Sequence, residues 1–513
     1  MGIVMRLAGA VYARATLRTH AVRKAQRRLD TLAARGCRFL ICIPYLKSGG
    51  AERVAANLAH ALAHLYGPES VAVLVTDWSG LMVRIVFPEN VFNNYPSGVQ
   101  IVNVTAMSHA PYDERVWDLM TAIVSMRPEM VININSQLMW ECWERFGPEM
   151  SRHTRLGTVA FLHMADKGGR PIGYTATHLE RLLPFLNFVI SDNESYITEL
   201  KGTLTSAPRT EKVASPIEWA AAKLLTRGLD LTKRTGQDLA HYVTAHRPTE
   251  AEWTTAKLLA RQMPVTRLDQ HDAAKFHCLY QYTTTGKAGS PFPRVTSKRP
   301  QILWASRVTR SKFPELLPRI ARLLPHCDIH AYGAREFGYR FPRAKRLLLP
   351  QYDLGDRIPK ARNLFWHGGY RSLDAIHPEQ FNVLVYTSLY DGLPNVLLEA
   401  GAHGVPIVAP IAVGGIGELI SEETGWAVLN QYDAREYADR IQEVLSSSRD
   451  ATARADALGR LIEARHCFED FCTDVRKLVE DTPHLTSEDA PLTSEDTPPT
   501  SEDAPHLTSI AAE

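Results

Sequence analysis

The chain has 513 residues, of which 45% are hydrophobic and 22% charged, a composition typical of a soluble globular protein with two or three domains. The formal net charge of +2 excludes a strongly basic field, so we expect no nucleic-acid partner. The seven cysteines are dispersed without a Cys-x-x-Cys pair, and no apolar run approaches the roughly 18 residues of a membrane helix. These features predict reduced thiols and a cytoplasmic location.

Residues 1–36 form a basic segment with a helical pattern, in which Asp30 is the only acidic residue. Two interpretations stay open. A basic helix can lie peripherally on an anionic membrane face, and a solvated helix packed against the edge of a domain has the same charge pattern. The apolar side of the helix is weak, which favours the second interpretation.

Short apolar segments alternate with helical patterns in two blocks along the chain. The expected strands are residues 39–44, 71–77, 131–134, 158–163 and 188–193 in the first block, and 301–306, 328–333, 363–368, 382–388 and 405–410 in the second. Strands separated by helices predict parallel sheets. We therefore expect an α/β protein with two Rossmann-like domains, residues 37–298 and 299–455, facing each other across a ligand-binding cleft.

The alternation breaks between residues 203 and 275. Two related strings in this stretch, EWAAAKLLTR (218–227) and EWTTAKLLAR (252–261), predict a helical insertion in the first domain. The insertion is either a structural lobe or a surface for an acceptor or partner. At the other end of the chain, residues 481–513 repeat acidic strings such as TSEDAPL that lack large apolar groups, which predicts a disordered tail without a catalytic role.

The most informative string is VYTSLYDGLPNVLLEAGAHGVPIVAPIAVGGIGELI, residues 385–420. It predicts a strand, a loop that carries Asp391, a helix with Pro394 as its first residue, a second strand and a glycine turn. The unpaired N–H groups in the first turn of that helix, together with the helix dipole, favour binding of an anion.

This string resembles the nucleotide-sugar site of the family-4 glycosyltransferases, which are retaining enzymes with the GT-B architecture. Their signature is an acidic residue, seven intervening residues and then Glu, which here spans Asp391 to Glu399. The resemblance implies that Glu399 binds the donor ribose with both carboxylate oxygens, that Asn395 contributes to donor binding, and that Asp391 acts next to the transferred sugar. The family usually has Glu at the position of Asp391, so the identity of the sugar does not carry over.

Two further parts of the second block resemble the family's donor site. Arg307 and Lys312 follow an expected strand, and the resemblance implies that both hold the donor diphosphate and stabilise the charge on the leaving group. The glycine turn at residues 414–417 places the N–H of Gly415 where it can meet a phosphate. The role of Glu418, which follows this turn, stays open.

The first block carries two more candidates. The string SGGAERV (48–54) resembles the glycine loop of the family, with Gly49 and Gly50 next to the donor phosphate. His163 ends an expected strand, and the resemblance implies that it contacts the donor sugar near the reacting carbon. The last helix of the family crosses back to the first domain, and residues 456–480 are its expected counterpart here.

The sequence thus predicts a retaining hexosyltransferase that uses a nucleotide-diphosphate sugar and a glycan or lipid-linked acceptor. The resemblance implies a setting in surface polysaccharide or lipopolysaccharide assembly. We expect no metal and no cofactor, since the chain has neither Asp-x-Asp nor a His/Cys cluster with zinc spacing. Two alternatives stay open: a GT-B-like sugar-nucleotide epimerase, which needs acid/base carboxylates and no acceptor, and a non-catalytic module that only binds.

Overall fold

The structure is a computed structural model that describes residues 20–46, 49–77, 94–160, 164–165, 171–172, 178–205, 270–283, 297–335 and 358–483. Several expectations lie outside the described residues. These are the start of the basic segment, most of the helical insertion, His163, and the tail from residue 484 onward.

The described part of the first domain contains a sheet with strand order β3-β2-β1-β4-β5-β8-β9, in which every neighbouring pair is parallel. Its strands are β1 (Phe39–Ile43), β2 (Val71–Val75), β3 (Gln100–Asn103), β4 (Met130–Asn133), β5 (Arg155–Val159), β8 (Phe188–Ser191) and β9 (Phe276–Cys278). A separate antiparallel pair is formed by β6 (Met164–Ala165) and β7 (Pro171–Ile172). Strand β5 begins three residues before the expected start at residue 158.

Helices cover both faces of this sheet, which explains why its strands are continuous apolar runs. Phe39 and Ile41 of β1 pack in the cluster that contains α2 and α18, whereas Leu40 packs on the opposite face against α4, α5 and the helix over residues 20–35. The helices are α2 (Gly50–Tyr66), α4 (Tyr112–Met126), α5 (Gln137–Ser151), α6 (Glu180–Leu182), α7 (Glu194–Thr205), α11 (Gln270–Ala274) and α18 (Phe468–Asp481).

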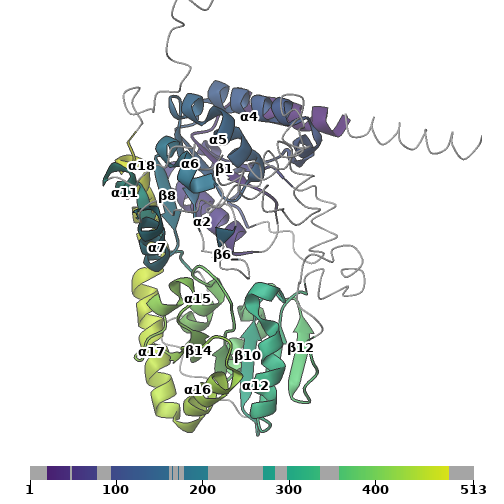
Figure 1. Cartoon of the computed structure of the whole chain (residues 1–513), viewed down its shortest axis with the longest axis vertical. Coiled ribbons are helices and arrows are strands. Elements are labelled where there is room, and N and C mark those ends of the chain that lie inside the picture. Colours follow the sequence, from purple (N-terminus) through teal and green to yellow (C-terminus); the bar gives the residue numbers. More distant parts are fainter. Residues whose placement is uncertain are drawn as a thin grey trace, which may run out of the picture.

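The described part of the second domain has a parallel sheet of order β12-β11-β10-β13-β14-β15. Its strands are β10 (Gln301–Ala305), β11 (Asp328–Tyr332), β12 (Leu364–Gly368), β13 (Val383–Val385), β14 (Ile407–Pro410) and β15 (Trp426–Val428). The faces are covered by α12 (Leu317–Leu323) and α16 (Ala434–Ser446) on one side, and by α15 (Asn395–Ala402) and α17 (Ser448–Arg465) on the other. Figure 1 shows the two domains one above the other, with α15 on the side of the second domain that faces the first.

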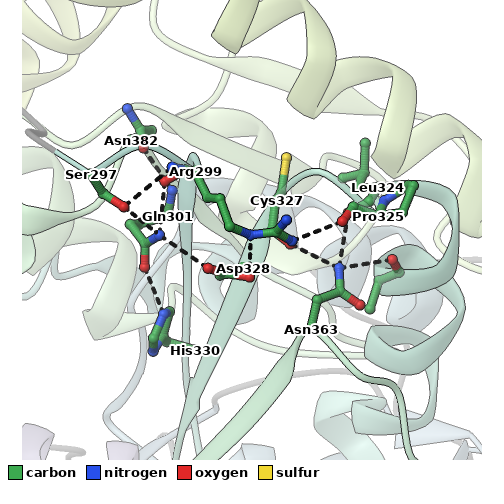
Figure 2. Close-up of polar contacts among 11 residues, drawn as sticks. Ser297, Arg299, Gln301, Leu324, Pro325, Cys327, Asp328, His330, Asn363 and Asn382 are labelled. Carbon is green, nitrogen blue, oxygen red and sulfur yellow. Dashed lines mark hydrogen bonds and ion pairs between the residues drawn. The ribbon is translucent and has the colours of Figure 1, made fainter.

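The amino ends of the second sheet are held by a polar network (Figure 2). Arg299 donates to Asp328 Oδ1 at 2.9 Å and to the carbonyl of Cys327 at 3.1 Å. Asn363, at the start of β12, donates to the same carbonyl at 2.8 Å, and the backbone N–H of Gln301 donates to Asn382 Oδ1 at 2.7 Å. These contacts join β10, β11, β12 and β13 at the end opposite the loops discussed below.

The C-terminal helix returns to the first domain. The chain leaves α17 at Arg465, and α18 then packs its apolar side against α2, as the yellow helix beside the first domain in Figure 1 shows. Arg155 donates to the carbonyl of Thr482 at 2.9 Å, and Asn187 donates to the carbonyl of Pro483 at 2.8 Å. The residues after α18 therefore still contact the first domain, two positions beyond the expected start of the tail at residue 481.

Within the described part of the chain, no helix combines the length and the apolarity needed to cross a membrane. All seven cysteines fall in that part, and each is a free thiol.

Candidate functional site

Loops at the carboxyl ends of both sheets meet between the domains. The glycine loop of the first domain leads into α2, with Gly49 as the N-cap residue and Gly50 as the first helical residue. A Cβ atom on Gly50 would lie 4.0 Å from Nδ2 of Asn395, at the start of α15 in the second domain. The structure therefore brings together three residues that the sequence assigned to donor binding. Pro394 is the N-cap residue of α15 rather than its first helical residue, one position away from the expected place.

Glu399 forms an ion pair with an unexpected partner. Its carboxylate is buried in α15, with 5% of the side chain exposed, and Oε1 accepts a hydrogen bond from Nη1 of Arg53. Arg53 lies in the first turn of α2, so the pair joins the two domains. The residue is part of the GGAERV string, but nothing in that string indicates which carboxylate it contacts.

Lys312 and Asp391 form a second ion pair, inside the second domain. Nζ of Lys312 donates to Asp391 Oδ2 and, at 2.8 Å, to the hydroxyl oxygen of Tyr386, whose own O–H donates to the same carboxylate oxygen. Burial lowers the pKa of Lys312, and the charge of Asp391 partly opposes this effect. Burial and the nearby carboxylate both raise the pKa of Tyr386. The cluster thus holds a cation and an anion together with little water around them.

Arg307 is close enough to Lys312 and to Tyr370 to influence both electrostatically. Its charge lowers the pKa of Lys312, and it acts in the same direction on Tyr370. Burial raises the pKa of Tyr370, Glu399 raises it further, and Arg53 opposes the rise. Arg307 therefore lies within electrostatic reach of Lys312 and of Tyr370, which Arg53 and Glu399 also influence.

The glycine turn packs between the Asp391 loop and the first domain. Gly414 has a φ of 53°, and a Cβ atom there would lie 1.8 Å from the carbonyl oxygen of Asp391, so only glycine fits. The N–H of Gly415 donates to the carbonyl of Gly392 at 3.1 Å. A Cβ atom on Gly415 would lie 2.5 Å from that of Asn193 in the first domain. Close packing is thus one reason for the glycines in this turn.

Asp192 reaches the Asp391 loop from the first domain. It follows β8, and its Oδ2 accepts the backbone N–H of Leu393 at 3.1 Å, while Oδ1 accepts from Nδ2 of Asn193 at 2.8 Å. Burial raises the pKa of Asp192 to about 7; the two hydrogen bonds act against that rise, and the charge of Asp391 adds to it. A strand over residues 188–193 was expected, and β8 ends at Ser191, but the contact of Asp192 with the other domain was not expected.

Glu418, whose role the sequence left open, also contacts the first domain. It accepts hydrogen bonds from the N–H and the hydroxyl of Ser195, at 2.7 and 2.6 Å, and from the hydroxyl of Tyr280 at 2.7 Å. Burial acts to raise the pKa of Glu418, but these hydrogen bonds outweigh it and the pKa lies below its usual range. Because Ser195 is in the first turn of α7, the carboxylate also caps that helix.

Among the residues that the structure describes, no group of three or more His, Cys, Asp or Glu side chains is arranged to hold a metal ion. The predicted donor-site residues other than His163 all belong to the described part of the chain, and they gather around the loops at the boundary between the domains. Sequence reasoning missed Arg53, Asp192, Tyr370 and Tyr386.

Two parallel sheets with helices on both faces, loops that meet at their carboxyl ends, and a last helix that returns to the first domain define the GT-B class. Solved structures support this fold. HepE of Anabaena, in complex with UDP and glucose, has a TM-score of 0.54 and 12% identity, over 86% of this chain and 99% of that one. The lipopolysaccharide outer core galactosyltransferase WaaB has a TM-score of 0.50 and 12% identity, over 87% of this chain and 99% of that one.

The second domain matches a family model. Residues 299–447 match the family described as glycosyl transferases group 1, and the resemblance found in the sequence is confirmed. A curated relative, D-inositol 3-phosphate glycosyltransferase of Mycolicibacterium smegmatis, is 27% identical over 161 residues. That stretch covers 30% of this chain and 35% of the relative, so the chain spans about a third of the relative's length.

Proposed function

We propose that this protein is a retaining glycosyltransferase, which moves a hexose from a nucleotide-diphosphate sugar to a glycan or lipid-linked acceptor. The observation that carries the proposal is the buried carboxylate of Glu399 in a domain that matches the group 1 family. Glu399 lies on α15, the helix that follows the loop of Asp391, and Asp391 pairs with the cation Lys312, which Arg307 influences. Such an arrangement suits a ligand with hydroxyl groups at one end and a diphosphate at the other.

The cations have a clear task in this reaction. When the bond between the anomeric carbon and the phosphate oxygen breaks, negative charge grows on the leaving diphosphate. Lys312 and Arg307 stabilise that charge, and one such preorganised group is typically worth about 10²–10³ in rate. Lys312 is already paired with Asp391. The diphosphate therefore has to share this cation with the carboxylate of Asp391 or displace that carboxylate.

In this proposal the anomeric configuration of the sugar is retained, because the acceptor attacks from the same face of the sugar that the diphosphate leaves. The acceptor oxygen forms the new bond to the anomeric carbon, and the acceptor proton passes to the phosphate oxygen of the leaving group. This route requires no side chain as general base. Asp391 is then a group that orients Lys312 and the sugar. The contact of His163 with the sugar stays a prediction, because this residue lies outside the described residues.

Assembly of a surface polysaccharide or lipopolysaccharide is the setting we propose. WaaB, which shares the fold, is a lipopolysaccharide galactosyltransferase, and this likeness suggests a saccharide acceptor of the same general kind. HepE was solved with UDP, which makes uridine diphosphate the first nucleotide to test.

Contact with an anionic membrane would be electrostatic in this proposal. The helix over residues 20–35 buries Ala25 and Leu29 in the first domain, so its apolar side is occupied, whereas Arg23, Lys24 and Arg27 are exposed. Each such cation adds up to ~1 kcal/mol near an anionic surface. Sedimentation with phosphatidylserine vesicles should show salt-sensitive binding that weakens when all three are changed to Ala. Equal binding of the two proteins would contradict the membrane contact.

The function is tested by incubating the full chain with a panel of nucleotide sugars, beginning with UDP-glucose, and measuring release of nucleoside diphosphate. Transfer predicts release that rises when a suitable acceptor is added and persists in EDTA. Conversion of the donor sugar without release would identify an epimerase instead. Binding without either change would identify a module that only binds. Glu399→Ala is the matched control, with at least about tenfold weaker nucleotide binding, since a charged hydrogen bond is worth roughly 1.5–3 kcal/mol.

A further inference from the structure

The ion pair between Arg53 and Glu399 has a geometry that leaves room for a ligand. Arg53 contacts Oε1, and Oε2 accepts no hydrogen bond from the described residues. A carboxylate has acceptor sites on both oxygens, so Oε2 is free to receive a hydroxyl group while Oε1 stays with the guanidinium. The contact therefore orients the carboxylate without blocking all of it.

The pair also links the domains. Arg53 belongs to α2 of the first domain and Glu399 to α15 of the second, and the two residues are 346 positions apart along the chain. Arg53 keeps 34% of its side chain exposed, whereas Glu399 keeps 5%. A largely buried carboxylate gains most from a fixed cation, because burial removes the water that would otherwise stabilise its charge. That cation is present only when the domains are as close as they are here.

Neighbouring residues support a built contact. The first turn of α2 lies close to the start of α15, since a Cβ atom on Gly50 would be in ordinary van der Waals contact with Asn395, 4.0 Å from its Nδ2. Tyr370 is half-buried and lies within electrostatic reach of both Arg53 and Glu399. The arrangement therefore includes the helix starts of both domains, and it does not depend on one flexible side chain.

We propose that Arg53 is a positioning residue, which orients Glu399 for the donor and thereby couples nucleotide-sugar binding to the approach of the two domains. The part that concerns the donor rests on the proposed function. The part that concerns the domains does not, because it follows from the ion pair alone. A ligand that needs an oriented Glu399 binds better to the closed arrangement, and binding then shifts the population toward it.

The test compares Arg53→Ala, Arg53→Lys, Glu399→Ala and the double variant Arg53→Ala/Glu399→Ala with the wild-type chain. Arg435→Ala, an exposed arginine on α16, is the matched control. Calorimetry with UDP measures binding, and hydrogen–deuterium exchange of residues 395–402 measures how well α15 is held against the first domain. If a donor is found, its KM and kcat are measured as well.

The proposal predicts that Arg53→Ala weakens UDP binding about tenfold, speeds exchange at α15 with and without UDP, and raises the KM for the donor more than it lowers kcat. Arg53→Lys should recover part of each effect. The double variant should bind no more weakly than Glu399→Ala, since Arg53 acts through Glu399. The Arg435→Ala variant should behave as wild type.

Three results would overturn the proposal. Tighter UDP binding by Arg53→Ala would mean that Arg53 competes with the ligand. Additive losses in the double variant would mean that Arg53 acts independently of Glu399. Unchanged exchange at α15 in Arg53→Ala would refute the link between the domains, whether or not a nucleotide binds. If the wild-type chain binds no nucleoside diphosphate, the proposed function and the donor role of Arg53 are refuted. If exchange at α15 is nevertheless faster in Arg53→Ala, the link between the domains still holds.

Discussion

Lys312 shows how one residue serves both folding and the site. Its ammonium group is paired with Asp391, and 13% and 17% of the two side chains are exposed. Removing one member of such a pair leaves a charge with little water around it, which is far more costly than losing a surface ion pair. A cation expected only to hold the diphosphate is therefore also part of the folded second domain.

Replacing Lys312 with Ala should thus lower stability as well as turnover. We expect a loss of about 3 kcal/mol, because Asp391 then keeps, among the described residues, only its hydroxyl partners. Arg307→Ala should lower turnover with a much smaller change in melting temperature. The double variant Lys312→Met/Asp391→Asn should recover stability but not turnover. Thermal unfolding and initial rates provide the comparison, and a wild-type melting temperature for Lys312→Ala would contradict this account.

Asp192 should make stability depend on pH. The folded chain keeps its proton up to about pH 7, whereas an unfolded chain releases it near pH 3.9. The folded state is therefore relatively favoured at low pH, and this advantage is lost as the pH rises from about 4 to 7. Asp192→Asn resembles the protonated form, so its melting temperature should exceed that of wild type by roughly 3 °C or more at pH 8. The difference should be small at pH 4.5, and an equal difference at both values would refute this titration.

At the scale of the element, α18 is the part of the C-terminal region that belongs to the first domain. Phe471, Val475 and Leu478 are buried against that domain. The residues that follow the helix are held through their backbone carbonyl groups. Carbonyl groups in and after the helix accept hydrogen bonds from the side chains of Arg155 and Asn187. The end of the helix is therefore fixed by groups that lie beyond its apolar pattern.

Two truncated chains should separate the tail from this docking segment. A chain that ends at Pro483 keeps every described contact and should match the wild-type melting temperature and donor turnover. A chain that ends at Glu480 loses the contacts of Arg155 and Asn187 with the last residues, and should melt about 2–4 °C lower per kcal/mol lost. Equal melting of the two truncated chains would show that these contacts contribute nothing.

At the scale of the whole molecule, several of the described contacts between the domains are polar. Arg53 pairs with Glu399, Asp192 accepts from the Asp391 loop, and Glu418 caps α7. The chain crosses from the second domain to the first next to His466, whose Nδ1–H donates to the carbonyl of Gln281 at 2.7 Å. Polar contacts of this kind can be exchanged for contacts with a ligand at little cost, which suits domains that have to bind and release a substrate.

His466 should make the molecule sensitive to acid. Burial lowers the pKa of His466 to about 4, and its Nε2 is buried without a hydrogen-bond partner among the described residues. The unfolded chain takes up this proton near pH 6.5, so the stability that the neutral ring contributes is lost as the pH falls from about 6.5 to 4. His466→Gln should melt lower than wild type at pH 7.5 but lose fewer degrees between pH 6.5 and 4.5. Parallel losses in the two proteins would refute this role.

The pattern of elements was predictable because it depends on local chemistry. Apolar runs such as residues 39–43 and 301–305 are long enough for a buried strand and are separated by helical patterns, so the two parallel sheets followed from them. The donor-site string was recognisable because Asp391, Pro394 and Glu399 lie close together in the chain. The sequence indicated the boundary of the insertion and the role of His163 less clearly. Nothing in the neighbouring residues distinguishes a site residue at a strand end from an ordinary one.

The sequence by itself determined the class of fold, the resemblance of the second domain to a glycosyltransferase family and the residues of the Asp391 loop. Only the tertiary structure decided which groups they face. Arg53 contacts Glu399, and Asp192 contacts Leu393, across 346 and 201 positions of the chain. A propensity or a spacing reports on neighbours within a few residues, whereas these contacts depend on how two separately built sheets are set against each other. The charge of a buried carboxylate makes such a partner necessary, but only the arrangement of the domains selects it.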